Sequence, residues 1–185
     1  MKKISTKKLA LVGVFTALCF AANYISIPVP ATVGITRVHV ANGICILAGM
    51  ILGPLFGGFC AGFGAMLYDF TNPVFAPGAP ITFLMKFVLG LVAGLIAYSG
   101  GRKAENNLMN LIAAIAAAFS YVIVYLIKTF ITAKYVKGLP MEAVWVDVGT
   151  KAWASSINAI IAIILSVVLI KAILPLVKRN EVDDI

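Results

Sequence analysis

The stretch VWVDVGTKAWASSIN, residues 144–158, opens a long apolar segment that runs to about residue 173. It carries an acid, a base, a hydroxyl and an amide at Asp147, Lys151, Ser155 and Asn158. At 3.6 residues per turn, these four positions fall on one face of a helix. A charge near the centre of a bilayer costs roughly 2.5–3.5 kcal/mol, so we expect this face to point into a bundle or a watery cavity. The rest of the chain is interpreted as the wall around that cavity.

The composition places the whole chain in a membrane. Hydrophobic residues make up 62% of it and charged residues 12%, and the mean hydropathy is +1.03. Because each crossing needs about 20 apolar residues, the chain has room for roughly six helices and little else. We predict an all-α integral membrane bundle of six transmembrane helices that forms a single domain over residues 1–185. The predicted helices cover residues 8–27, 37–54, 57–72, 81–98, 107–133 and 142–172.

The basic residues outside the apolar segments give the orientation. The positive-inside rule predicts a multi-pass protein of the plasma membrane with both termini in the cytoplasm. Lys134 and Lys137 lie in the expected outer loops, against nine basic residues on the expected inner side: Lys2, Lys3, Lys7, Lys8, Arg102, Lys103, Lys171, Lys178 and Arg179. The net charge of +8 is therefore spread over helix ends and helix interiors. We expect no nucleic-acid binding, because the charge does not gather on a soluble face.

The charges at membrane depth are distributed unevenly. Every one lies in the outer half of a predicted helix or at its outer end: Arg37, His39, Asp69, Lys86, Lys128, Glu142, Asp147 and Lys151. The inner halves carry no charged side chain, and no chain of acids or histidines crosses the bundle. This asymmetry predicts a binding site that opens outward and contains no proton pathway.

Residues that share helix faces at this level form the predicted ligand site. The candidates are Arg37, His39, Asn42, Asp69, Asn72, Lys86, Tyr125, Lys128, Trp145, Asp147, Lys151 and Asn158. We expect Lys86, Lys128 and Lys151 to hold anionic groups, the asparagines to donate and accept hydrogen bonds, and Trp145 to close the apolar side. Cations outnumber acids in this set, which favours a ligand with a carboxylate. Pantothenate is the preferred single candidate, and folate and other vitamins remain open.

Structural roles are alternatives for several of these residues. Asp147 and Lys151 are spaced i, i+4 and can simply pair with each other. Arg37, Glu142 and Trp145 can be anchors at the membrane interface, and the tyrosines at 121 and 125 can be ordinary packing residues. Such pairs alone would not explain why all the membrane-depth charges lie on one side.

The sequence offers little for catalysis, metals or cofactors. Cys19, Cys45 and Cys60 all lie in apolar segments without a CxxC pair, and the chain has one histidine. We therefore predict no metal site, no cofactor and no catalytic residues, which disfavours a small membrane enzyme. A phosphate loop of the form GxxxxGK[ST] is absent from the sequence, so ATP hydrolysis would belong to partners. The alternative hypothesis for the function of the chain is an autonomous small-solute transporter or channel that acts as a homo-oligomer.

Small residues form a stripe on the first predicted helix. Gly13, Ala17 and Ala21 are spaced at four residues on a span without internal charges. Such stripes allow close helix contact in lipid, so this face is predicted to contact a partner helix, with packing inside the bundle as the alternative. Similar glycine pairs at 49/53, 58/62 and 90/94 are expected to pack the bundle internally.

Four blocks of sequence resemble one family. They are ALCFA (17–21), IPVP (27–30), RVHVANGICILAGMILGPLFGG (37–58) and YDFTNP (68–73). Together with the length and the six predicted helices, they resemble the substrate-binding S components of energy-coupling-factor (ECF) vitamin importers. The resemblance implies a vitamin-binding subunit that works with a transmembrane T component and two cytoplasmic ATPases. It also implies that Ala17 and Ala21 face the T component, that the ligand lies near the outer surface, and that the subunit topples to release it.

Overall fold

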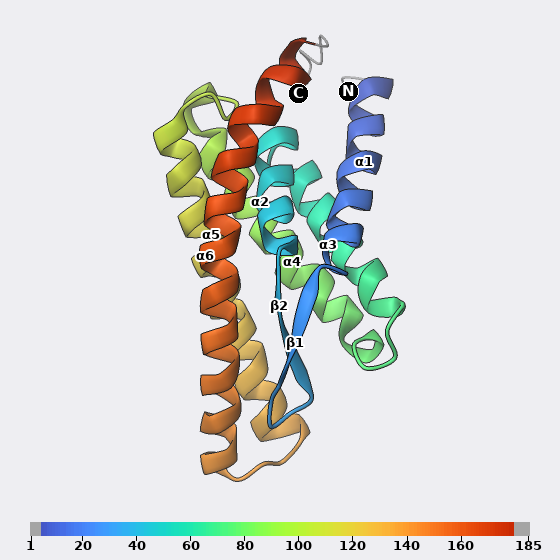
Figure 1. Ribbon diagram of the computed structural model, residues 1–185, viewed down its shortest axis with the longest axis vertical. Coiled ribbons are helices and arrows are strands. Elements are labelled where there is room, and N and C mark those ends of the chain that lie inside the picture. The colour runs from blue at the N-terminus through green and yellow to red at the C-terminus, as the bar shows by residue number, and fades with distance from the viewer. Residues whose placement is uncertain (1–4, 180–185) are drawn as a thin grey trace.

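The computed structural model describes residues 5–179; Lys2 and Lys3 of the predicted cytoplasmic group lie outside them. The structure is a bundle of long helices with one short β-hairpin along its side (Figure 1). The two ends of the described chain lie at the same end of the bundle (Figure 1). The elements are, in order, α1 (Thr6–Ala22), β1 (Ser26–Pro30), β2 (Ile35–His39), α2 (Ala41–Leu52), α3 (Pro54–Phe70), η1 (Ala76–Gly78), α4 (Ala79–Ala97), η2 (Ser99–Gly101), α5 (Asn107–Ile131), η3 (Thr132–Val136) and α6 (Met141–Arg179).

The hairpin is the main departure from the predicted helices. Helices were expected over residues 8–27 and 37–54, but α1 ends at Ala22 and α2 begins at Ala41. Between them, β1 and β2 pair antiparallel from Ser26↔His39 to Pro30↔Ile35. Prolines at 28 and 30 cannot continue a helix, and Gly34, at φ +73°, adopts the left-handed conformation that the turn requires. Arg37 and His39 therefore lie on a strand.

The helices differ in their ability to cross a bilayer. Within residues 5–179, three helical stretches are long and apolar enough: Ala76–Ala97, Asn107–Val136 and Met141–Arg179. The helices α1 and α3 have 17 residues each and α2 has 12. With 39 residues, α6 is about 60 Å long and contains Pro175 near its inner end. It continues seven residues beyond the predicted boundary at residue 172.

Glycines bring α2, α3 and α4 into backbone contact. A Cβ added at Gly49 would lie 2.2 Å from the carbonyl oxygen of Gly90, and one at Gly57 would lie 2.3 Å from the Cα of Gly49. Side chains larger than hydrogen would therefore push these helices apart. Gly13 on α1, in contrast, meets no atom within 4 Å. The small-residue stripe of α1 consequently faces away from the bundle.

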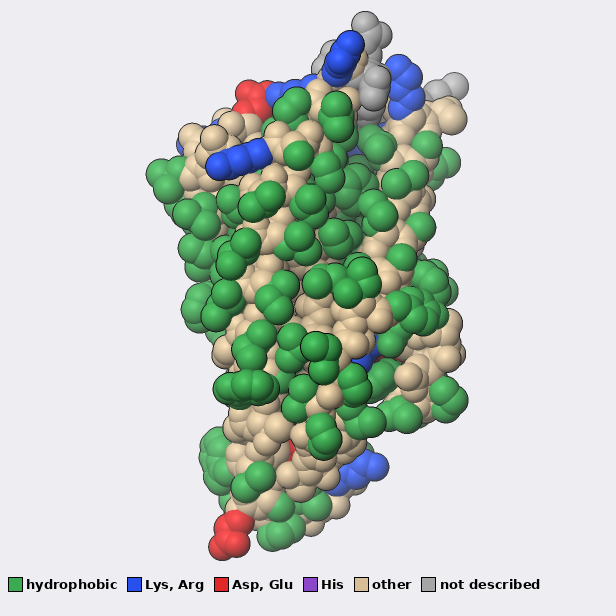
Figure 2. Space-filling view, in the orientation of Figure 1, with side chains coloured by type: hydrophobic (Ala, Val, Ile, Leu, Met, Phe, Trp, Pro, Cys, Tyr) green, Lys and Arg blue, Asp and Glu red, His purple; other side chains and the backbone are tan. Residues whose placement is uncertain are grey.

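The surface separates into bands. In the view of Figure 2, a broad apolar zone covers the middle of the molecule, and charged side chains gather near the end that holds the termini and again lower down. This arrangement matches a protein whose waist lies in hydrocarbon and whose ends reach the headgroups.

Candidate functional site

A cavity lies where the hairpin meets the helices, in the half of the bundle away from the termini. Its volume is about 110 Å³. Residues from the hairpin, from the ends of α1 and α3 and from α4, α5 and α6 line it: Asn23, Ile35, Thr36, Arg37, His39, Asp69, Phe75, Thr82, Met85, Lys86, Tyr121, Tyr125, Lys128, Ser155 and Asn158. Seven of the twelve predicted ligand residues are among them, namely Arg37, His39, Asp69, Lys86, Tyr125, Lys128 and Asn158. The other five, Asn42, Asn72, Trp145, Asp147 and Lys151, are not.

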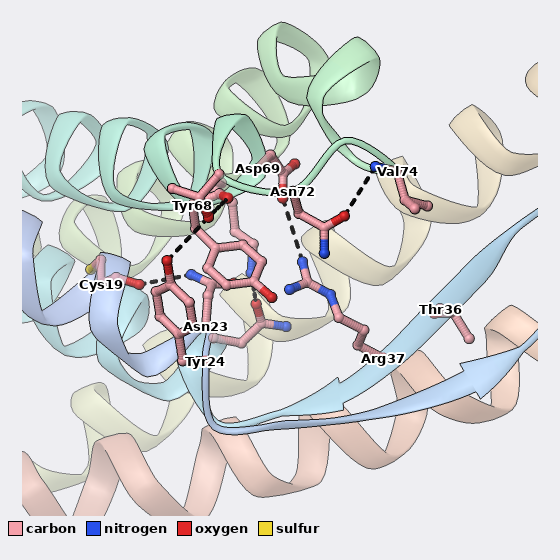
Figure 3. A network of polar contacts seen from close by, with 12 residues as sticks. Cys19, Asn23, Tyr24, Thr36, Arg37, Tyr68, Asp69, Asn72 and Val74 are labelled. Carbon is pink, nitrogen blue, oxygen red and sulfur yellow. Dashed lines mark hydrogen bonds and ion pairs between the residues drawn. The ribbon is translucent and has the colours of Figure 1, made fainter.

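Arg37 crosses from β2 to the end of α3. Its Nη2 lies 3.5 Å from Oδ1 of Asp69, and its guanidinium carbon lies 4.4 Å and 4.3 Å from the ring centroids of Tyr68 and Phe75. Figure 3 shows the side chain reaching from the strand toward Asp69. Two aromatic faces and one carboxylate thus hold the guanidinium, and they tie the hairpin to α3. Its Nη1 is buried and has no hydrogen-bond partner among residues 5–179.

Lys86 is a buried cation without a carboxylate partner. Only 2% of it is exposed, and its Nζ donates a hydrogen bond to Oδ1 of Asn42. The same Nζ lies 4.9 Å from the ring centroid of Tyr121. Asn42 therefore holds the ammonium group of Lys86 and is not among the residues that line the cavity. Neither of these two partners carries a negative charge, and Lys86 forms no ion pair with a carboxylate within the described part of the chain.

Lys128 is the third cationic side chain that lines the cavity. It comes from α5, is half-buried, and makes no hydrogen bond or ion pair with the described residues. Beside it, the rings of Tyr121 and Tyr125 stack with centroids 5.9 Å apart and planes within 6°. The cavity thus combines three cationic side chains, one acid and two tyrosine faces. Its electrostatic character is positive.

Asn158 fixes the base of the hairpin on α6. Its Oδ1 accepts from the backbone N–H of His39 at 2.7 Å, and its Nδ2 donates to the carbonyl of Arg37, also at 2.7 Å. Both ends of the amide are therefore engaged by the edge of β2. His39 lines the cavity with a buried Nδ1 that has no partner in the described structure. Two of the residues that line the cavity thus carry a buried polar atom without a hydrogen-bond partner among residues 5–179, namely this nitrogen and Nη1 of Arg37.

Asp147 and Lys151 bind the tip of the hairpin. Oδ1 of Asp147 accepts from the backbone N–H of Val33 at 2.7 Å. Nζ of Lys151 donates to the carbonyl of Val33 at 3.0 Å and to Oδ2 of Asp147 at 2.8 Å. We call these three residues the hairpin clasp. The predicted pairing within α6 is present, and the same two side chains also satisfy both backbone groups of Val33.

Trp145 and Asn72 lie outside the cavity for different reasons. Trp145 is 59% exposed and packs against Phe130, with ring centroids 5.7 Å apart. The side chains of α6 that line the cavity are Ser155 and Asn158, so Trp145 does not close it. Its position suits an anchor at the membrane interface. Asn72 accepts from the N–H of Val74 at 3.0 Å and orders the turn after α3.

The structure also brings in residues that the sequence reasoning missed. Thr36 hydrogen-bonds to the hydroxyl of Tyr125 at 3.0 Å, which joins β2 to α5. Asn23, at the end of α1, donates to the carbonyl of Cys19 at 2.7 Å and lines the cavity. Prolines at 28 and 30 were the available signal that an extended segment follows α1, but they do not reveal which of its side chains face inward.

The fold and this cavity define a class: a helical membrane protein with a polar cavity between a β-hairpin and the helices, in the half of the bundle away from the termini. The chain belongs to the family described as "ECF-type riboflavin transporter, S component", whose model matches residues 3–174. It is a substrate-binding transport subunit of the plasma membrane, and ECF importers of this kind operate with a T component and ATPases.

One solved structure described as "Structure and mechanism of the S component of a bacterial ECF transporter" has a TM-score of 0.64 to this chain. The match covers 93% of this chain and 98% of that one at 19% sequence identity, so it establishes the fold. No curated protein sequence matches the chain.

Proposed function

We propose that the cavity captures a small vitamin that carries a carboxylate, and that pantothenate is the best single candidate. The observation that carries this proposal is that neither Lys86 nor Lys128 forms an ion pair with an acid among residues 5–179, while Arg37 already faces Asp69. An ammonium group removed from water without a counter-charge is costly by several kcal/mol. A ligand carboxylate between the two lysines would remove this cost and would gain charge-assisted hydrogen bonds.

The size of the cavity supports a small ligand. Typical small-molecule sites measure roughly 300–1,000 Å³, whereas this cavity holds about 110 Å³. Folate, with its pteridine, benzoate and glutamate groups, requires much more room than pantothenate. Riboflavin, which the family description names, has three fused rings and no carboxylate. It would leave both lysines without a counter-charge, so it is the competing ligand that the experiment must include.

The small-residue stripe of α1 supports a partner contact. Gly13, Ala17 and Ala21 are exposed, while Phe15 and Cys19 on the other side of the helix are buried. We assign the exposed stripe to contact with the T component, because small side chains allow a partner helix to approach closely in lipid.

The test begins with mass spectrometry of the small molecule that remains bound to the purified chain. Pantothenate, folate and riboflavin are then titrated into emptied protein, with Lys86→Met and Lys128→Met as variants and the exposed Lys137→Met as the matched control. Each cavity variant is expected to weaken carboxylate binding at least tenfold, since each lost charged hydrogen bond is worth about 1.5–3 kcal/mol. Tight riboflavin binding that survives both substitutions would refute the carboxylate assignment and leave the transport role intact.

A further inference from the structure

Two cations that hold the hairpin in place are each paired with an acid. Nη2 of Arg37 lies 3.5 Å from Oδ1 of Asp69. Nζ of Lys151 lies 2.8 Å from Oδ2 of Asp147, and both side chains are buried. A buried charge is costly unless an opposite charge and hydrogen bonds satisfy it. An ion pair is therefore the arrangement that this protein uses for the cations that stabilise its fold.

The partner of Lys86 is an amide instead of an acid. Nζ of Lys86 donates a hydrogen bond to Oδ1 of Asn42, and the two side chains are 2% and 3% exposed. Asn42 is the second residue of α2, whose first turn contains no acidic residue, so the positive end of the helix dipole adds to the positive charge here. The ring of Tyr121 lies on another side of the ammonium group, at 4.9 Å. Amide and ring thus hold the ammonium group in place without forming an ion pair.

Position 42 determines the charge of this contact. Asparagine and aspartate have nearly the same shape, and an aspartate at 42 would accept the same hydrogen bond from Lys86. It would also add a carboxylate, and would form a buried ion pair with Lys86 of the kind that Asp147 forms with Lys151. The lysine would then have its counter-charge before any ligand arrives. The neutral amide orients the ammonium group but leaves it free to attract an anion.

We propose that Asn42 is a positioning residue that sets the charge preference of the cavity. Lys86 lines the cavity whereas Asn42 does not, so Asn42 acts through the lysine and not on the ligand itself. The inference rests on the proposed function, because it requires a ligand with an anionic group. An acid at position 42 should therefore abolish the preference for an anion and leave the binding of a neutral analogue unchanged.

Two probes that differ in one group measure the charge preference. Pantothenate carries a carboxylate, and pantothenol has the same skeleton with a hydroxymethyl group in its place. Isothermal titration calorimetry on the emptied full chain is expected to show that pantothenate binds about tenfold or more tightly than pantothenol, as one charge-assisted hydrogen bond contributes. In Asn42→Asp the affinity for pantothenate should fall by about the same factor, so that the two probes bind almost equally.

A matched control makes the same change of charge elsewhere. Asn106 is the exposed N-cap of α5 and accepts a hydrogen bond from the backbone N–H of Met109. Aspartate caps a helix as well as asparagine does, so Asn106→Asp should fold normally. Because Asn106 does not line the cavity, this variant should keep the full preference for pantothenate.

Two further measurements distinguish positioning from a merely structural role. Thermal unfolding of the emptied Asn42→Asp protein should show a midpoint that is not lower than in the wild type, because the new carboxylate gives Lys86 a counter-charge. Asn42→Leu removes the acceptor without adding a charge. It should weaken the binding of pantothenate several-fold, because the ammonium group is no longer held in place, and should leave pantothenol unaffected.

The outcomes separate this inference from the proposed function. A wild-type preference for pantothenate that persists in Asn42→Asp would overturn the role of Asn42 and leave the carboxylate assignment intact. Unchanged pantothenate binding in Asn42→Leu, or a lower unfolding midpoint in Asn42→Asp, would also overturn it. Equal binding of the two probes by the wild type, or binding of neither, would refute the proposed function, and the inference would fall with it.

Discussion

Replacing Lys151 with methionine should loosen the hairpin without removing the cavity. In the hairpin clasp, Lys151 is 7% exposed and its ammonium bonds to the carbonyl of Val33 and to Asp147. Methionine has a similar length and fills the same space, but it donates no hydrogen bond. Asp147, which is fully buried, then keeps only the N–H of Val33 as a partner. The tip of the hairpin loses one of its two bonds to α6.

The expected magnitude follows from the bonds that are lost. A hydrogen bond to a charged group contributes about 1.5–3 kcal/mol, and the bond to Val33 is the one that directly restrains the hairpin. A loss of about 2 kcal/mol multiplies the population of the open hairpin by roughly thirty. Removing one member of a buried ion pair costs about 3–5 kcal/mol in total, so overall stability should fall as well.

Hydrogen exchange followed by mass spectrometry measures the opening directly. Peptides that cover residues 26–39 should exchange about thirtyfold faster in the variant, while peptides from α4 should change much less. Lys137→Met, an exposed lysine in the loop before α6, serves as the control and should leave the hairpin unaffected. Dissociation of the bound ligand should accelerate in parallel, because the hairpin covers the cavity. Unchanged exchange in residues 26–39 would refute the role of the clasp.

Three further substitutions test other parts of the account. Gly49→Ala places a Cβ 2.2 Å from the carbonyl oxygen of Gly90 and should lower the free energy of unfolding of the bundle by at least about 1–3 kcal/mol, measured by thermal unfolding. Gly149→Ala is its control: a Cβ there meets no atom within 4 Å, so this change should stabilise the helix slightly. Ala17→Leu should prevent co-purification with the T component and ATPases while ligand binding remains normal; retained assembly would refute the assignment of the α1 stripe. Arg37→Lys keeps the charge but loses the flat contact with two aromatic rings, so ligand release should be several-fold faster in stopped-flow measurements. An unaltered rate would contradict the conclusion that Arg37 ties the hairpin to α3.

Sequence reasoning recovered the bundle because lipid imposes strong constraints. Apolar runs of about 20 residues and the placement of lysine and arginine determine a helical membrane protein and its orientation. The hairpin was missed because its strands are five residues each and contain prolines, which indicate an interruption without indicating its shape. The predicted second helix consequently began four residues too early, at Arg37, and α6 continued beyond 172 because Pro175 did not end it.

The site, like the fold, was predictable from the sequence only in part. The shared face of Asp147, Lys151 and Asn158 was predictable from helical spacing, but their partners on the hairpin were not, because these partners are backbone atoms more than 100 residues away. Trp145 was assigned to the cavity although its spacing from Asp147 already placed it on another face. Asn42 was predicted to bind the ligand, whereas in the structure its Oδ1 accepts a hydrogen bond from Lys86. Pattern alone does not distinguish a residue that meets a ligand from one that supports its neighbour.

The structure of the ligand-loaded protein would test the central claim most directly. We expect a ligand carboxylate between Lys86 and Lys128, with an oxygen about 3 Å from each Nζ and the hairpin closed over it. A neutral ligand in the cavity, with both ammonium groups turned away from it, would contradict the claim that these two uncompensated cations define what the protein carries.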